Sequence, residues 1–108
     1  MLKLEYSPVA LDKLGAVYRY IANELYNPNG AAKVISSIRD KVRKLKFMPE
    51  LGAPLASRCA FVPEHLLDVR VLLCGKYIVM YRHDGNTIKV LCIYHIAEDY
   101  VSHLFEMQ

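Results

Sequence analysis

Five side chains in the second half of the chain have acid–base or charge properties suited to cleaving a phosphodiester: Arg70, Tyr81, Arg82, His83 and His95. Such a reaction needs a base to remove a proton, cations to stabilise the charged transition state, and an acid or cation for the leaving oxygen. Histidine titrates near neutral pH, whereas arginine carries a fixed positive charge. These five residues are therefore the candidates for a catalytic site, if the protein is an enzyme.

Basic residues are concentrated in the first half of the chain, although the formal net charge is only +3. Residues 1–54 contain nine Lys and Arg against five Asp and Glu, and five of the eight residues from 39 to 46 are basic. A basic patch attracts nucleic acid or an acidic protein segment, although a solvated helix face gives the same pattern. The candidate partner contacts are Arg39, Arg43, Lys46 and, further along the chain, Lys76.

The spacing of cysteine and histidine predicts no metal site, no disulfide framework and no cofactor. Cys59, Cys74 and Cys92 form no CxxC pair, and no two histidines have the spacing that places both on one helix face. We expect the cysteines to be buried or half-buried as small hydrophobic residues. No apolar run approaches the roughly 20 residues of a membrane span, and the start lacks the apolar core of a signal peptide. A cytoplasmic protein is therefore expected.

One domain must position these residues, because 108 residues suffice for one hydrophobic core. Alternating apolar and charged residues predict a strand at residues 2–6. Ser7-Pro8 and Asn27-Pro28 each predict a helix start, because a capping side chain precedes a proline at the first helical position. The apolar stripes that should enter the core are Leu11, Leu14, Tyr18, Ile21 and Leu25 in the first helix, and Ala31, Val34, Ile35, Ile38, Val42 and Leu45 in the second.

The rest of the chain predicts a sheet. Residues 49–66 read as an irregular connection packed by Leu51, Leu55 and Phe61, and strands are expected at 67–73, 77–83 and 87–94. Asp84-Gly85 predicts a tight turn, and the long apolar runs indicate that both faces of the sheet are covered. Residues 97–107 predict a short helix. The fold class is α+β: an N-terminal strand, an antiparallel helical hairpin packed on a three- to four-stranded antiparallel sheet, and a short C-terminal helix.

Several short motifs, in this order along nearly the whole chain, are together characteristic of one family. They include Leu4-Glu5-Tyr6-Ser7-Pro8, Phe47-Met48-Pro49-Glu50-Leu51-Gly52-Ala53-Pro54-Leu55, Tyr81-Arg82-His83-Asp84-Gly85-Asn86-Thr87 and Asp99-Tyr100. With the order of elements, they resemble the RelE/ParE toxins of type II toxin–antitoxin systems, most closely the ParE-like plasmid-stabilisation branch. The resemblance implies a single toxin domain over residues 1–108 that inhibits growth and is neutralised by a cognate antitoxin protein.

The resemblance leaves the target open, because these toxins share a fold while some cleave mRNA on the ribosome and others inhibit DNA gyrase. His95 lies near the point where some ribonuclease relatives have a catalytic histidine. Two departures oppose cleavage: Ile78 stands where ribonuclease relatives have an arginine, and Ile96-Ala97-Glu98 stands where many relatives have Gly-Arg-Arg.

The favoured hypothesis is gyrase inhibition without hydrolysis, with an antitoxin helix laid across the sheet and the helical hairpin. One alternative is a ribosome-dependent mRNA endonuclease that uses His95 with Arg70 or Arg82. The other is a non-toxic relative that only forms complexes.

Overall fold

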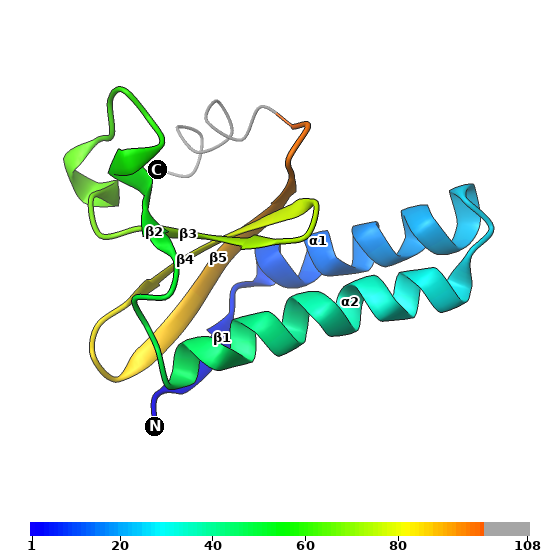
Figure 1. Ribbon diagram of the computed structural model, residues 1–108, viewed down its shortest axis with the longest axis horizontal. Coiled ribbons are helices and arrows are strands. Elements are labelled where there is room, and N and C mark those ends of the chain that lie inside the picture. The colour runs from blue at the N-terminus through cyan, green and yellow to red at the C-terminus, as the bar shows by residue number, and fades with distance from the viewer. Residues whose placement is uncertain (99–108) are drawn as a thin grey trace.

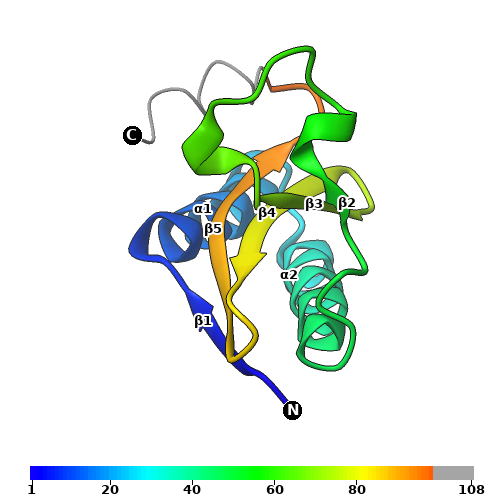
Figure 2. The same ribbon diagram turned by 90° about the vertical axis from the view of Figure 1, so that its left-hand side faces the viewer.

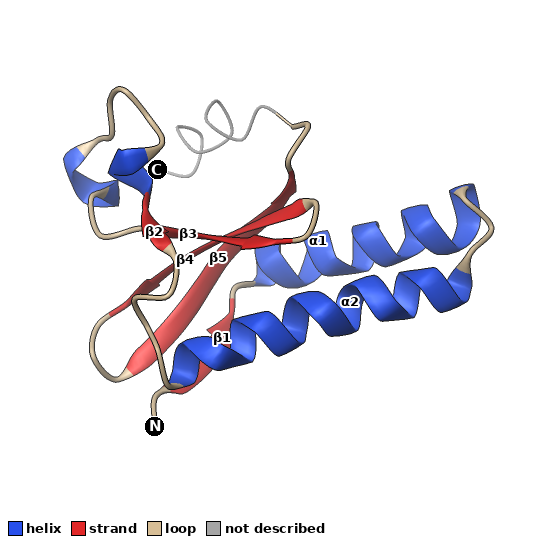
Figure 3. Ribbon diagram, viewed as in Figure 1, coloured by secondary structure: helices blue, strands red, loops and turns tan. Residues whose placement is uncertain are grey.

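The computed structural model describes residues 1–98, which form a five-stranded sheet with two long helices on one face (Figures 1 and 3). The strands are β1 (Lys3–Tyr6), β2 (Ala53–Pro54), β3 (Arg70–Cys74), β4 (Tyr77–His83) and β5 (Thr87–His95). Helix α1 (Pro8–Arg19) continues as a π-helix (Tyr20–Glu24), and α2 (Pro28–Arg43) continues as a 3-10 turn (Lys44–Lys46). Two more 3-10 turns, Leu55–Ser57 and Glu64–Leu66, lie between β2 and β3.

The strand order is β1-β5-β4-β3-β2, in which β1 and β5 are parallel and the other neighbours are antiparallel. The α+β class and the helical hairpin are confirmed, but the predicted three- to four-stranded antiparallel sheet was wrong in strand number and in the direction of β1. Strand β4 pairs with one edge of β5, and β1 pairs with the other edge along residues 87–90. This pairing satisfies backbone groups that a free edge would leave exposed.

Both predicted helix starts are confirmed by their capping hydrogen bonds. The Oγ of Ser7 accepts a hydrogen bond from the N–H of Ala10 (3.0 Å), and Oδ1 of Asn27 accepts one from the N–H of Gly30 (3.0 Å). Ser7 Oγ also donates to the carbonyl of Leu91 (2.7 Å). The start of α1 is therefore fastened to β5 as well as capped.

The main core lies between the helical hairpin and the sheet. The stripe predicted for the second helix is confirmed: Ala31, Ile38, Val42 and Leu45 are buried, and Val34 and Ile35 pack half-buried against this core. In the first helix Leu14 and Ile21 are buried, as predicted, and Ala10 joins them.

The rest of the first stripe was predicted wrongly, because Leu11, Tyr18 and Leu25 are exposed. Two features explain the exposure of Leu25, the last residue of the stripe. The wider turn of the π-helix, with an N–H to O bond from Leu25 to Tyr20, shifts the face that later residues present. The hairpin also extends well beyond the sheet, so its far end has no strand to pack against (Figure 1).

The opposite face of the sheet is covered by the segment between β2 and β3 (Figure 2). Leu55, Leu66 and Val69 from this segment pack against sheet residues that include Ile78 and Met80. The predicted cover on both faces is therefore confirmed.

Some details of this second half were predicted wrongly. Leu51 and Phe61 do not pack, since both are exposed. Strand β3 begins at Arg70, because the N–H groups of Leu67 and Val69 bond back to carbonyls of the 3-10 turn Glu64–Leu66. Cys74 and Cys92 are buried and Cys59 is half-buried. The helix predicted at 97–107 lies almost wholly outside the described residues.

Candidate functional site

Tyr81 and Arg70, two of the catalytic candidates, hold the chain segment that leads into β2. Tyr81 is fully buried, and its hydroxyl donates a hydrogen bond to the carbonyl of Pro49 (2.7 Å) and accepts one from the N–H of Gly52 (2.9 Å). Arg70 Nη1 donates to the carbonyl of Gly52 (2.7 Å). Burial raises the pKa of the Tyr81 hydroxyl, which stays protonated at neutral pH.

Gly52 itself fits this place because it has no side chain. A Cβ atom there would lie 2.8 Å from the Tyr81 ring and 2.8 Å from the carbonyl of Val71. Tyr81 and Arg70 therefore bind a backbone segment that is tightly packed against them, and their polar groups are engaged in holding it.

Arg82 and His83 lie at the hairpin between β4 and β5. Arg82 Nη2 binds Oδ1 of Asp68 (2.8 Å) and the carbonyl of His65 (2.8 Å), so Arg82 anchors the segment on the opposite face of the sheet. His83 ends β4 opposite Ile88. The predicted turn at Asp84-Gly85 is confirmed, with Asp84 Oδ1 accepting hydrogen bonds from two backbone N–H groups. These bonds lower the pKa of the Asp84 carboxyl.

His95 lies at the other end of the sheet from Arg70 and Tyr81. His95 pairs with Tyr77, whereas Arg70 pairs with Tyr81. Tyr77 and Tyr81 are four residues apart on β4, which places them roughly 13 Å from each other along the strand. The five catalytic candidates therefore do not meet in one place.

The ring of His95 contacts a backbone N–H group and a tyrosine ring. Nδ1 accepts a hydrogen bond from the N–H of Ala97 (3.0 Å), so the neutral ring carries its proton on Nε2. The ring of Tyr77 packs edge-to-face at 5.3 Å. These two contacts fix the orientation of the ring.

A groove of about 1000 Å³ separates the far part of the helical hairpin from the ends of β3, β4 and β5. Its apolar lining comes from both helices and from the strand ends. The residues that carry this lining are Val17, Tyr20, Ile21, Leu25, Val34, Ile38, Tyr77 and Ile93. Tyr20 and Leu25 are 56% and 55% exposed, although both are large hydrophobic residues. An apolar hollow of this kind is typical of a binding site for another apolar surface.

The charged residues that line this groove are mainly basic: Lys13, Lys33, Lys41 and Lys76, with Glu98 as the acidic member. Lys13 Nζ lies 3.4 Å from Glu98 Oε2 and 5.3 Å from the centre of the Tyr94 ring. Lys41 Nζ donates a hydrogen bond to the carbonyl of Leu73. Burial, and then the neighbouring Tyr20 and Glu98, raise the pKa of Tyr77.

Of the candidate partner contacts, Lys76 lines the groove and the other three lie elsewhere. The guanidinium of Arg39 packs over the ring of Tyr6 at 5.1 Å, and Arg43 pairs with Asp40 at 2.7 Å. Lys46 accepts a backbone hydrogen bond from Leu2 through its carbonyl. These three residues form a separate basic surface near β1.

Sequence reasoning missed Lys13, Lys33 and Lys41 as groove residues, because no spacing marks them. The usable signal was the length of the apolar stripe in the first helix. The stripe ends at Leu25, which is exposed and lines the groove together with Tyr20, a residue outside the predicted stripe.

Within residues 1–98, no three His, Cys, Asp or Glu side chains gather in a way that could hold a metal ion. None of the helices in this part of the chain is both long and apolar enough to cross a membrane.

The helical hairpin and the five-stranded sheet together define a toxin of the RelE/ParE superfamily. Residues 4–100 match the family described as the ParE toxin of the type II toxin–antitoxin system parDE. The chain belongs to the ParE toxin family. No curated protein sequence matches the chain.

Two solved structures have a similar fold. A chain of the chromosomal ParDE TA system from P. aeruginosa is 25% identical, with a TM-score of 0.65, over 88% of this chain and 96% of that one. A chain of the toxin–antitoxin complex RelBE2 from Mycobacterium tuberculosis is 15% identical, with a TM-score of 0.61, over 87% of this chain and 96% of that one. The chain is thus a type II toxin of the ParE family.

Proposed function

We propose that this ParE-family toxin inhibits growth by binding DNA gyrase without cleaving a substrate, and that a cognate antitoxin neutralises it in the cytoplasm. The observation that carries the proposal is the separation of the cleavage candidates. Arg70, Tyr81 and Arg82 bind backbone groups or Asp68, and they lie apart from His95. A phosphodiester cleavage site needs its base and its cations around one reacting group.

The state of His95 supports the same proposal. Its Nδ1 is engaged by the N–H of Ala97, and its Nε2 carries the proton of the neutral ring. Ile78, which stands where ribonuclease relatives have an arginine, is buried and supplies no cation. Inhibition by binding requires none of these groups to exchange protons.

The groove supports the antitoxin part of the proposal. A helix of the antitoxin lies along the groove, with its apolar face against Tyr20, Leu25 and Tyr77. The exposed apolar side chains of the free toxin then become buried. The neighbouring lysines favour an acidic flank on that helix.

The test compares the wild-type protein with His95→Ala, and with His65→Ala as a control for loss of an exposed histidine. Each protein is induced in cells while growth, transcript integrity and gyrase supercoiling are followed. We expect all three to arrest growth, leave transcripts intact and inhibit supercoiling. Co-expression of the protein encoded by the neighbouring reading frame should restore growth.

The ribosome-dependent endonuclease is the second candidate, because His95 lies in a groove lined by several lysines. Rapid cleavage of transcripts that is lost in His95→Ala but kept in His65→Ala would establish it instead of gyrase inhibition. Growth without arrest would contradict both toxic mechanisms and support a relative that only forms complexes.

A further inference from the structure

The charge of the groove is distributed unequally between its two sides. Helix α1 packs over β5 and α2 lies beside β3, so the two helices define two flanks. The flank on the α2 side carries Lys33, Lys41 and Lys76. The flank on the α1 side carries Lys13 together with Glu98, which offsets its charge.

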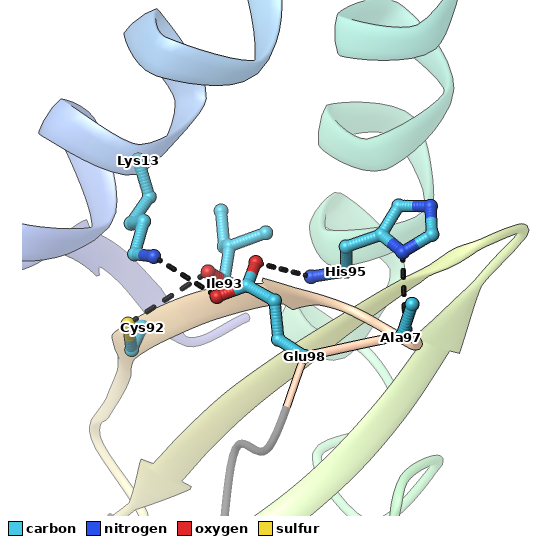
Figure 4. A network of polar contacts seen from close by, with 6 residues as sticks. All are labelled: Lys13, Cys92, Ile93, His95, Ala97 and Glu98. Carbon is cyan, nitrogen blue, oxygen red and sulfur yellow. Dashed lines mark hydrogen bonds and ion pairs between the residues drawn. The ribbon is translucent and has the colours of Figure 1, made fainter. Parts of the chain in front are cut away.

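Glu98 is held in this position by the turn that follows β5 (Figure 4). Its Oε1 accepts a hydrogen bond from the N–H of His95 (3.0 Å), and its own N–H donates to the carbonyl of His95 (2.9 Å). The hydrogen bond from Ala97 to the His95 ring closes the same turn. Glu98 Oε2 then reaches Lys13 on α1. The carboxylate is therefore placed by backbone groups and does not depend on Lys13 alone.

The pair contributes more to the potential of the groove than to folding. The side chains of Lys13 and Glu98 are 35% and 36% exposed, and a pair so accessible to water adds little stability. Both charges line the groove, so removing either one changes the potential that a bound helix meets. Among residues 1–98, the charge of this flank thus depends on both side chains.

We propose that Glu98 is a specificity residue for the partner helix. Because Glu98 offsets the charge of Lys13, the partner helix needs carboxylates only on its side that faces Lys33, Lys41 and Lys76. The occupant is an amphipathic helix with an apolar stripe, one acidic flank and one uncharged flank, and its identity as the antitoxin rests on the proposed function. Charge matching of this kind discriminates between partners more than it adds affinity.

The probes are two hydrocarbon-stapled helical peptides with the same Leu and Ile stripe. The one-flank peptide has glutamates on one side of the stripe and glutamines on the other, and the two-flank peptide has glutamates on both sides. Affinities for the full-length protein are measured by calorimetry at low salt, where charge effects are least screened. The measured quantity is the ratio of the two affinities, two-flank peptide over one-flank peptide. A substitution that weakens the binding of both peptides equally leaves this ratio unchanged.

Two substitutions break the same ion pair but change this preference in opposite directions. Glu98→Gln leaves Lys13 unopposed, and we expect the preference for the two-flank peptide to rise about threefold. Lys13→Gln removes the cation that faces Glu98, and we expect the preference to fall about threefold. A role limited to holding the turn in place would shift both variants in the same direction.

Exposed residues outside the groove provide controls with matched changes in net charge. Glu64→Gln matches Glu98→Gln, and Lys89→Gln matches Lys13→Gln. The inference is overturned if the groove variants shift the preference no more than these controls, if both shift it in one direction, or if neither peptide binds the wild-type protein.

Growth arrest tests the proposed function separately from the peptide measurements. A protein that arrests growth but fails the peptide test loses only the role of Glu98. If the peptide test succeeds but the protein does not arrest growth, the role of Glu98 in the groove is supported and the toxin mechanism is contradicted.

Discussion

Tyr81 is buried beneath the segment that joins α2 to β2, where its hydroxyl binds two backbone groups. Arg70 and Arg82 have comparable roles, since each donates to carbonyls of the connection between α2 and β3. Polar side chains on neighbouring strands thus fasten a long irregular connection whose backbone groups would otherwise lack partners. The same side-chain types would suit a reaction, so their chemistry alone does not distinguish the two roles.

Tyr81→Phe should lower the free energy of unfolding by about 1–3 kcal/mol, because the N–H of Gly52 and the carbonyl of Pro49 lose their partner. Urea unfolding followed by circular dichroism measures the change. Tyr26→Phe, at a tyrosine that is 88% exposed, is the matched control and should have little effect. Equal stability of the two variants would show that the hydroxyl of Tyr81 does not hold this segment.

The start of α1 has one more stabilising contact than the start of α2. Ser7 caps α1 and also donates to the carbonyl of Leu91 in β5, whereas Asn27 caps α2 at an exposed position. Ser7→Ala should therefore destabilise the protein by about 2 kcal/mol and Asn27→Ala by about 1 kcal/mol, as measured by urea unfolding. A larger effect for Asn27→Ala would contradict the assigned contact between α1 and β5.

Elements with a local cause were predictable from the sequence. The caps at Ser7 and Asn27 and the turn at Asp84 depend on neighbouring residues, and each is present. The parallel pairing of β1 with β5 joins residues more than 80 positions apart, and strand alternation specifies neither the neighbour nor its direction.

The catalytic candidates failed to converge for a related reason. Arg70 and His95 belong to the same sheet, but register places them at opposite ends of it. Side-chain type is a local property, whereas the distance between two side chains depends on the whole fold. The groove was missed because a stripe that enters a core and a stripe that binds a partner have the same helical period.

At the scale of the whole molecule, the helical hairpin extends beyond the sheet that it covers (Figure 1). Its near part closes the core through residues such as Leu14 and Val42. Its far part, with Tyr20 and Leu25, stands over the groove. One pair of helices thus serves folding at one end and, in the proposed function, antitoxin binding at the other.

This division predicts that stability and binding separate along α1 and its continuation. Leu14→Ala removes a side chain that is 4% exposed and should cost about 2–5 kcal/mol of unfolding free energy. Leu25→Ala removes one that is 55% exposed, so it should change stability by less than about 0.5 kcal/mol. Leu25→Ala should instead weaken binding of the one-flank stapled peptide about tenfold, because the bound helix buries that side chain.

Urea unfolding and calorimetry with the same peptide test both halves of this prediction. Leu11→Ala is the control, because Leu11 is an exposed leucine of α1 that does not line the groove. It should leave both stability and binding nearly unchanged. If Leu25→Ala destabilised the protein as strongly as Leu14→Ala, the far end of the hairpin would belong to the core. The groove would then be a packing feature of the fold, since its apolar lining would already be in use.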